Sequence, residues 1–189
     1  RRRPGKRTGS KRKESDIPRF LSGLIDGTSS GAPIAFVIPN EDARREDYDQ
    51  LKELYRPSHG DFTYHKKYGI DDHRLVHRAS ARETAVRVVA GGIAKQLLAK
   101  SGIFISGITS CIGPLRIDRD FSFEEMEMAA TTSLQCPDKI LTRKMSRFLT
   151  ALRKEGDSIG CEIQALITGV PAGLGDPVFN KLQANLASA

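Results

Sequence analysis

The sequence contains no tryptophan, and aromatic residues occupy only 6% of its 189 positions. Cysteine is scarce as well, since Cys111, Cys136 and Cys161 are odd in number and far apart. This spacing predicts neither a disulfide framework nor a Cys-x-x-Cys metal site. Apolar runs of membrane-spanning length are absent, and we find no secretory segment. We therefore expect a globular cytoplasmic protein with three small, buried thiols in a reducing compartment.

Acidic residues are missing from the first 13 positions, which hold eight lysines and arginines. Without those eight, 22 basic residues remain beside 23 acidic ones, so the other positions carry a net charge of about −1. Residues 1–13 are thus a basic arm on an almost neutral body. Such an arm suits a nucleic acid or a polyanionic small molecule. It has no apolar face typical of a targeting helix and no aromatic ring for base stacking.

Hydrophobic periodicity predicts both helices and strands, and the length of the chain predicts a single domain over residues 1–189. A helix followed by a strand is expected twice, at 80–112 and 138–168, and this indicates an internal structural repeat. Residues 113–134 show no pattern from which we predict an element. The expected strands are 20–26, 34–38, 103–112 and 159–168, the first two as a hairpin, and the expected helices are 41–55, 80–102, 138–156 and 178–187.

A helix start is predicted at Ser80, because Ser80 and Glu83 have the spacing of a capping box. Ser80 would accept a hydrogen bond from the N–H of Glu83, and the Glu83 carboxylate would reach back to the N–H of Ser80. Arg78 precedes this start and Arg82 lies in its first turn. Free N–H groups beside two guanidinium groups are expected to attract an anion, most naturally a phosphate.

Six segments carry a resemblance to a known family. RPSHGDFTY from Arg56 and RASARETAVRVVAGGIAK from Arg78 resemble the corresponding segments of chorismate synthases. The same family order is kept by RRRPG at residue 1, FLSGLIDGTSSGAPIAFVI at 20, GDSIG at 156 and GVPAGLGDPVF at 169. Several ordered matches are far more specific than one short motif. The resemblance covers most of the chain and fails mainly between residues 113 and 134.

The resemblance implies a fold, an activity and a cofactor. The family fold is an α+β sandwich of antiparallel sheets and helices, usually assembled as a homotetramer. The implied reaction is a lyase step of the shikimate pathway for aromatic amino acid biosynthesis. It converts 5-enolpyruvylshikimate 3-phosphate to chorismate and phosphate by 1,4-anti elimination, and it requires reduced FMN although there is no net redox change. NADPH is the implied reductant, used either by the protein itself or by an external flavin reductase.

The resemblance also assigns site residues. His59 would be the catalytic residue that protonates the reduced flavin, and imidazole suits that role. The basic arm, residues 1–13, would lie at the active site. The implied FMN contacts are Arg78, Ala79 and Ser80, and the implied contacts to substrate or nucleotide phosphate are Arg2, Arg7 and Arg82.

The sequence differs from the usual family pattern at Asp71, where arginine is common, and at four further positions. Leu75, Val76 and His77 stand where three glycines are common, and Gly60 stands where alanine is common. Glycines permit a positive φ and close approach of a ligand to the backbone, which β-branched Val76 resists. His73 and His77 have the spacing of two helical metal ligands, but no third ligand is evident and neighbouring arginines would repel the ion. We therefore predict no metal site.

Two other functions remain open from the sequence. One is a non-catalytic protein whose basic arm binds a polyanion or a nucleic acid. The other is an inactive, truncated family member. Family members are considerably longer, so we expect this chain to be part of a longer protein.

Overall fold

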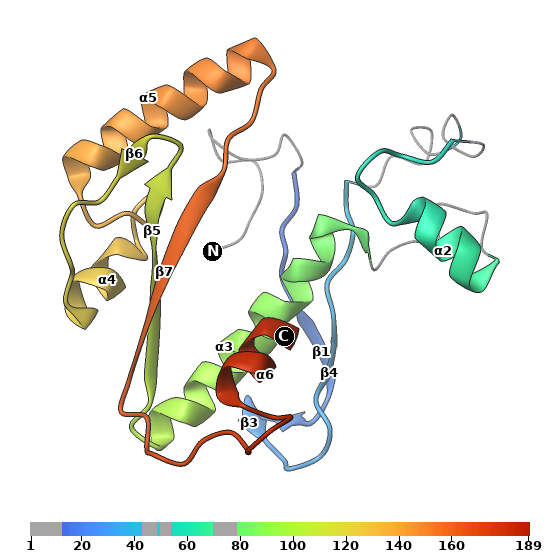
Figure 1. Cartoon of the computed structure of the whole chain (residues 1–189). Helices are drawn as coiled ribbons and strands as arrows, with labels where there is room; N and C mark the ends of the chain where they lie inside the picture. Colours follow the sequence, from blue (N-terminus) through green and yellow to red (C-terminus); the bar gives the residue numbers. More distant parts are fainter. Residues whose placement is uncertain (1–12, 43–48, 50–53, 70–78) are drawn as a thin grey trace. The chain divides into compact units, whose positions relative to one another are not determined.

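The computed structural model describes residues 13–42, 49, 54–69 and 79–189. The chain divides into two compact units, Arg1–Ile93 and Ala94–Ala189. Each unit contains helices and antiparallel strands, which confirms the predicted α+β class (Figure 1). The expectation of a single domain stays a prediction.

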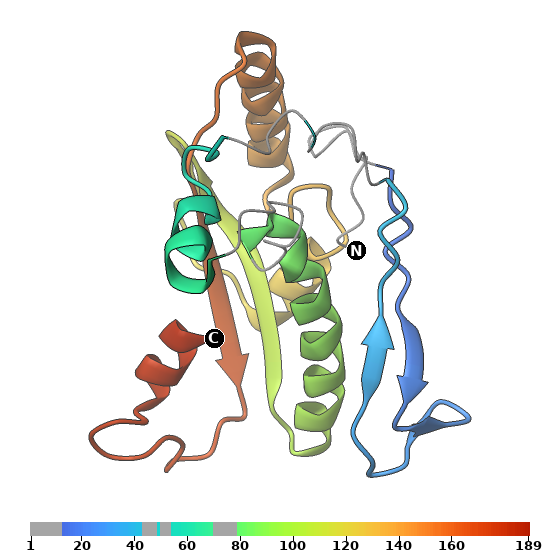
Figure 2. The same ribbon diagram turned by 90° about the vertical axis from the view of Figure 1, so that its right-hand side faces the viewer.

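The first unit begins with a hairpin, as the sequence predicts. Strand β1 (Arg19–Ser22) pairs antiparallel with β4 (Ala35–Val37), and Figure 2 shows the two side by side. The short strands β2 (Leu24–Ile25) and β3 (Thr28–Ser29) pair at the tip. Gly23 has a φ of 83°, and a Cβ there would lie 2.7 Å from the Cα of Ile34. Glycine is needed at this position because the two backbones approach so closely.

Helix α2 (Asp61–Tyr68) lies in the first unit, and helix α3 (Thr84–Lys100) begins there. Helix α2 was not predicted, and it ends at Gly69, which adopts a left-handed φ of 65°. The 3₁₀ turn η3 (Ala81–Glu83) leads into α3, which confirms the helix expected at 80–102. The helix expected at 41–55 falls mostly outside the described residues.

The second unit is built on a three-stranded antiparallel sheet in the order β6–β5–β7. The long strands run side by side from Phe104↔Thr168 to Ile112↔Cys161, with a register shift between Thr109 and Cys111 (Figure 1). The strands expected at 103–112 and 159–168 are thus confirmed. Their bounds are β5 (Phe104–Ile112), β6 (Leu115–Arg116) and β7 (Cys161–Thr168).

Two helices cover the buried side chains of β5. Ile108 packs against Met126 and Ala129 of α4 (Phe123–Ala129). Ile112 packs against Cys136 and against Met145 of α5 (Lys139–Glu155). Burial of these apolar side chains supplies the main stabilisation of the unit. Helix α5 confirms the helix expected at 138–156, since Asp138 caps its start and Gly156 ends it in a left-handed conformation.

Two expectations for the second unit are wrong. Helix α6 (Leu182–Ser188) begins later than the expected residue 178, because Val178 has a φ of 68° and the N–H of Asp176 binds the carbonyl of Asn180 in a turn. Cys111 and Cys136 are buried as expected, but Cys161 is exposed. It lies on β7, an edge strand of this sheet, where the described neighbours cover little of the strand.

Gly169 and Gly156 offer a matched test of close packing in this unit. Both have a positive φ, but a Cβ at Gly169 would lie 2.0 Å from the carbonyl oxygen of Gly102, whereas a Cβ at Gly156 would meet nothing within 4 Å. We expect Gly156→Ala to cost about 1 kcal/mol, the strain of the left-handed backbone alone. Gly169→Ala should cost at least about twice as much, since backbone atoms cannot rotate away. Urea unfolding followed by circular dichroism measures both losses, and equal losses would contradict the prediction.

Candidate functional site

A buried carboxylate lies at the start of α2. Asp61 is 0% exposed, and its carboxylate accepts two hydrogen bonds from the Arg56 guanidinium, both at 2.7 Å. The backbone N–H of Arg56 also donates to Asp61 at 3.1 Å. The Arg56 hydrogen bonds hold the pKa of Asp61 well below its usual range, although burial opposes this shift. Asp61 is therefore ionised and able only to accept hydrogen bonds.

His59 is held by the same carboxylate. Its Nδ1 lies 2.9 Å from Asp61 Oδ1, while its side chain stays partly exposed. The loop that carries it is a tight turn, in which the N–H of His59 donates to the carbonyl of Arg56 and Ser58 adopts a φ of 57°. Left-handed backbone is costly for serine, and such strain is typical of functional loops.

Gly60 brings this loop to the segment before α3. A Cβ on Gly60 would lie 2.9 Å from the Cβ of Ala79, so the Ala79 side chain lies close to the backbone of Gly60. The loop that carries His59 is therefore next to the segment that begins at Ala79. Sequence spacing alone could not show this proximity, because 19 positions separate Gly60 from Ala79.

The predicted capping box at Ser80 is wrong in its details. Ser80 Oγ accepts from the N–H of Arg82 at 3.2 Å, and the N–H of Glu83 donates to the Ser80 carbonyl instead. The reason is that the first turn is 3₁₀, which shortens the hydrogen-bond step. A complete capping box occurs at α4, where Ser122 and Glu125 exchange both bonds. That Ser-x-x-Glu pattern lies between residues 113 and 134, and the sequence analysis missed it.

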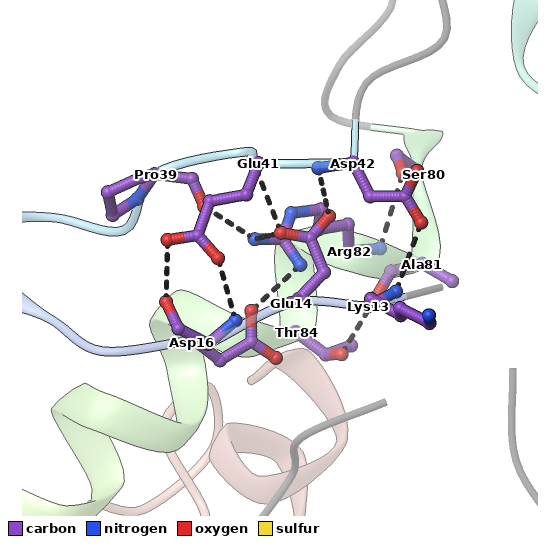
Figure 3. A network of polar contacts seen from close by, with 11 residues as sticks. Lys13, Glu14, Asp16, Pro39, Glu41, Asp42, Ser80, Ala81, Arg82 and Thr84 are labelled. Carbon is purple, nitrogen blue, oxygen red and sulfur yellow. Dashed lines mark hydrogen bonds and ion pairs between the residues drawn. The ribbon is translucent and has the colours of Figure 1, made fainter. Parts of the chain in front are cut away.

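Arg82 is surrounded by protein carboxylates (Figure 3). Its guanidinium lies 3.3 Å from Glu14 and 2.8 Å from Asp16, and it donates to the carbonyl of Pro39 at 2.8 Å. The side chains of Glu14 and Asp16 are 0% and 7% exposed. Arg82 therefore provides electrostatic compensation to two buried carboxylates.

Near Arg82, Glu14 and Ser15, which directly follow the basic arm, form hydrogen bonds with Glu41 and Asp42. Ser15 donates to the Glu41 carboxylate through its N–H and its hydroxyl, and these bonds lower the pKa of Glu41. The Glu14 carboxylate accepts from the N–H of Glu41 at 3.0 Å. Lys13, the last residue of the arm, donates its N–H to Asp42 at 3.0 Å (Figure 3). The end of the basic arm is thus anchored beside the start of α3.

The family profile described as chorismate synthase matches residues 1–189. The chain belongs to the chorismate synthase family. It is 44% identical over 190 residues to the chorismate synthase of Phocaeicola vulgatus and 47% identical over 194 residues to that of Porphyromonas gingivalis. Each alignment covers 100% of this chain but 53% and 52% of the relative. The chain therefore spans about half the length of these curated relatives.

A solved structure agrees with the sequence relatives. A crystal structure of chorismate synthase matches with a TM-score of 0.64 and 27% identity. The match covers 84% of this chain and 46% of that chain. The predicted chorismate synthase-like α+β fold is thereby confirmed.

Within this family frame, the structure describes part of the predicted site. Gly60, the neighbour of His59, lies against Ala79, and Arg82 lies in its own cluster of carboxylates. The sequence analysis did not single out the site residues Arg56 and Asp61, although the acid two positions after His59 was a usable signal. It also missed the Glu14-x-Asp16 pair. The predicted residues that lie outside the described part of the chain are Arg2, Arg7 and Arg78, with Leu75, Val76, His73 and His77.

The described residues contain neither a cluster of metal-binding side chains nor a membrane-spanning helix. No group of three or more His, Cys, Asp or Glu side chains there is placed to hold a metal ion. In the same part of the chain, no helix is both long enough and apolar enough to cross a bilayer.

Removing Arg82 tests its role as the partner of two buried acids. We expect Arg82→Gln to lower the free energy of unfolding by about 3 kcal/mol, because Glu14 and Asp16 would stay buried without the guanidinium charge that faces them. Arg87→Gln, an exposed position on α3, should change it by less than about 0.5 kcal/mol. Urea unfolding measures both. Adding Glu14→Gln to Arg82→Gln should restore part of the loss, and strictly additive losses would contradict the ion pair.

Proposed function

We propose that the protein carrying this chain converts 5-enolpyruvylshikimate 3-phosphate to chorismate and phosphate with reduced FMN. The observation that carries this proposal is the chorismate synthase profile match over residues 1–189. The geometry supports it, because the loop that carries an oriented histidine adjoins, through Gly60, the segment that leads into a helix. Reduced flavin would supply an electron transiently as the phosphate leaves.

His59 is the proposed catalytic acid toward the flavin. Its Nδ1 is occupied by Asp61, so its other ring nitrogen, Nε2, is the atom that would give or receive a proton. The side chain is 22% exposed, which leaves it accessible to a bound group. Gly60 has no Cβ, so the Ala79 side chain can lie close to the backbone next to His59.

FMN is proposed to bind along Arg78, Ala79 and Ser80. The residues present fit such a group. Ala79 and Ser80 precede the first turn of a helix, whose N-terminal N–H groups favour an anion, and Ala79 adjoins the His59 loop through Gly60. The roles of these residues are to bind the cofactor by backbone contacts and to place it against the imidazole.

Arg2, Arg7 and Arg82 are proposed to bind the anionic groups of the substrate. Arginine suits phosphate and carboxylate because its fork donates two parallel hydrogen bonds. Arg82 is already engaged by Glu14 and Asp16, so it would reach the substrate only by exchanging one of these partners. We therefore propose that Arg2 and Arg7 carry most of the attraction, while Arg82 anchors the end of the arm.

The oligomeric state, the location and the source of reduced FMN are proposed from the family. We propose a homotetramer in the cytoplasm, with FMN reduced either by NADPH on the protein itself or by an external flavin reductase. The alternative of a non-catalytic, basic-armed binding protein predicts polyanion binding that is lost when residues 1–13 are removed. The alternative of an inactive family member predicts ligand binding without turnover.

An FMN fluorescence titration of this chain, with and without 5-enolpyruvylshikimate 3-phosphate, tests the shared site. We expect FMN to bind more tightly when the substrate is present, because both would occupy one site. Shikimate, which lacks the phosphate, is the matched control and should have a much smaller effect. No FMN binding by the whole protein that contains this chain would contradict the proposal.

Replacing His59 tests its catalytic role. In the whole protein, His59→Ala should lower kcat by about 100-fold or more, the usual contribution of an acid–base group, while the affinity for substrate changes little. His65→Gln removes another imidazole, on α2, and should leave kcat nearly unchanged. Anaerobic assays of chorismate formation with chemically reduced FMN measure both variants. Unchanged turnover in His59→Ala would exclude His59 from the mechanism.

A further inference from the structure

We propose that Asp61 is the positioning residue of His59. Asp61 holds the imidazole with its proton on Nδ1, so that Nε2 is the nitrogen available for proton transfer. The catalytic half of this inference rests on the proposed function. The structural half, which concerns the tautomer and the orientation of the ring, does not depend on it.

The hydrogen-bond count at Asp61 carries the first step. Oδ2 accepts from Arg56 Nε at 2.7 Å and from the Arg56 backbone N–H at 3.1 Å. Oδ1 accepts from Arg56 Nη2 at 2.7 Å and lies 2.9 Å from His59 Nδ1. Each carboxylate oxygen therefore has at least two contacts. Because an ionised carboxylate has no hydrogen to give, the Nδ1 atom in contact with it must carry one.

The second step concerns the charge of the carboxylate. Arg56 binds Asp61 through a two-pronged contact, and these bonds keep the pKa of Asp61 far below that of an ordinary aspartate. Asp61 will not take the proton from His59 at any pH where the enzyme works. It is a fixed acceptor, which orients the ring and selects a tautomer, as carboxylates behind catalytic or metal-binding histidines do.

The third step concerns how firmly the ring is held. His59 sits in a turn closed by its own N–H on the Arg56 carbonyl, and the next two residues lead directly into α2. Arg56 thus contacts both residues: its carbonyl accepts from the N–H of His59, and its guanidinium donates to Asp61. Loss of the Asp61 carboxylate would free the ring to rotate and to adopt the Nε2–H tautomer, the one that has no proton on the nitrogen facing Asp61.

Nitrogen-15 NMR of the histidine side chains tests the structural half without any reaction. At about pH 9, where an ordinary imidazole is neutral, we expect His59 of this chain to show the Nδ1–H tautomer, assigned by its loss in His59→Gln. In Asp61→Asn we expect a shift toward Nε2–H. A wild-type His59 with Nε2–H would overturn the proposal, and this holds even if Asp61→Asn does not fold.

Kinetics of the whole protein test the catalytic half. Asp61→Asn should lower kcat by about 10- to 100-fold, the usual effect of losing such a supporting carboxylate, with KM for substrate changed little. Asp138→Asn is the matched control: the same substitution at the start of α5, where asparagine also caps a helix, so kcat should not change. A folded Asp61→Asn with an altered tautomer and unchanged kcat would overturn the catalytic half.

The outcomes also separate this inference from the proposed function. If the wild-type protein forms no chorismate but His59 carries its proton on Nδ1, the proposed function fails and the positioning role stands. If chorismate forms and the tautomer is Nε2–H, the positioning role fails and the proposed function stands.

Discussion

The described site depends on the pairing of buried carboxylates with arginines. Arg56 compensates Asp61 and Arg82 compensates Glu14 and Asp16, and the three acids are almost fully buried. An uncompensated buried charge costs several kcal/mol, so each pair forces its segments together. One pair fixes the His59 turn on α2, and the other fixes the end of the basic arm on the first turn before α3.

Local signals made much of the fold predictable. The helices at α3 and α5 and the strands β5 and β7 follow apolar periodicity and end at glycines that adopt a positive φ. The errors arose where a local pattern had more than one outcome. A Ser-x-x-Glu pattern gives a 3₁₀ turn at Ser80 and a full capping box at Ser122, and nothing in four residues distinguishes the two. Exposure of Cys161 depends on the order of the strands in the sheet, and the sequence of one strand does not reveal that order.

The site was predictable only in part, for a similar reason. Resemblance to the family pointed to His59, Ala79 and Ser80, but the contact that joins them passes through Gly60 and its short distance to Ala79. Asp61 was hidden because an acid in the first turn of a helix is ordinary, and its burial is a property of the folded chain. The carboxylate partners of Arg82 lie more than 60 positions away in the sequence, so the sequence predicted that its charge was available to a ligand.

In the proposed enzyme, the charges that attract the substrate and the charges that position the segments of the site belong to different parts of the chain. The net charge of +7 comes from the arm, since positions after 13 carry about −1. In the described body, arginines meet carboxylates at Arg56, Arg82, Arg116 and Arg119, so their fields are largely cancelled at a distance. An approaching polyanionic substrate would therefore be drawn by the arm rather than by Arg82. The network at Glu14 and Asp42 then matters because it fixes where the arm ends, beside the start of α3 and within the same unit as His59.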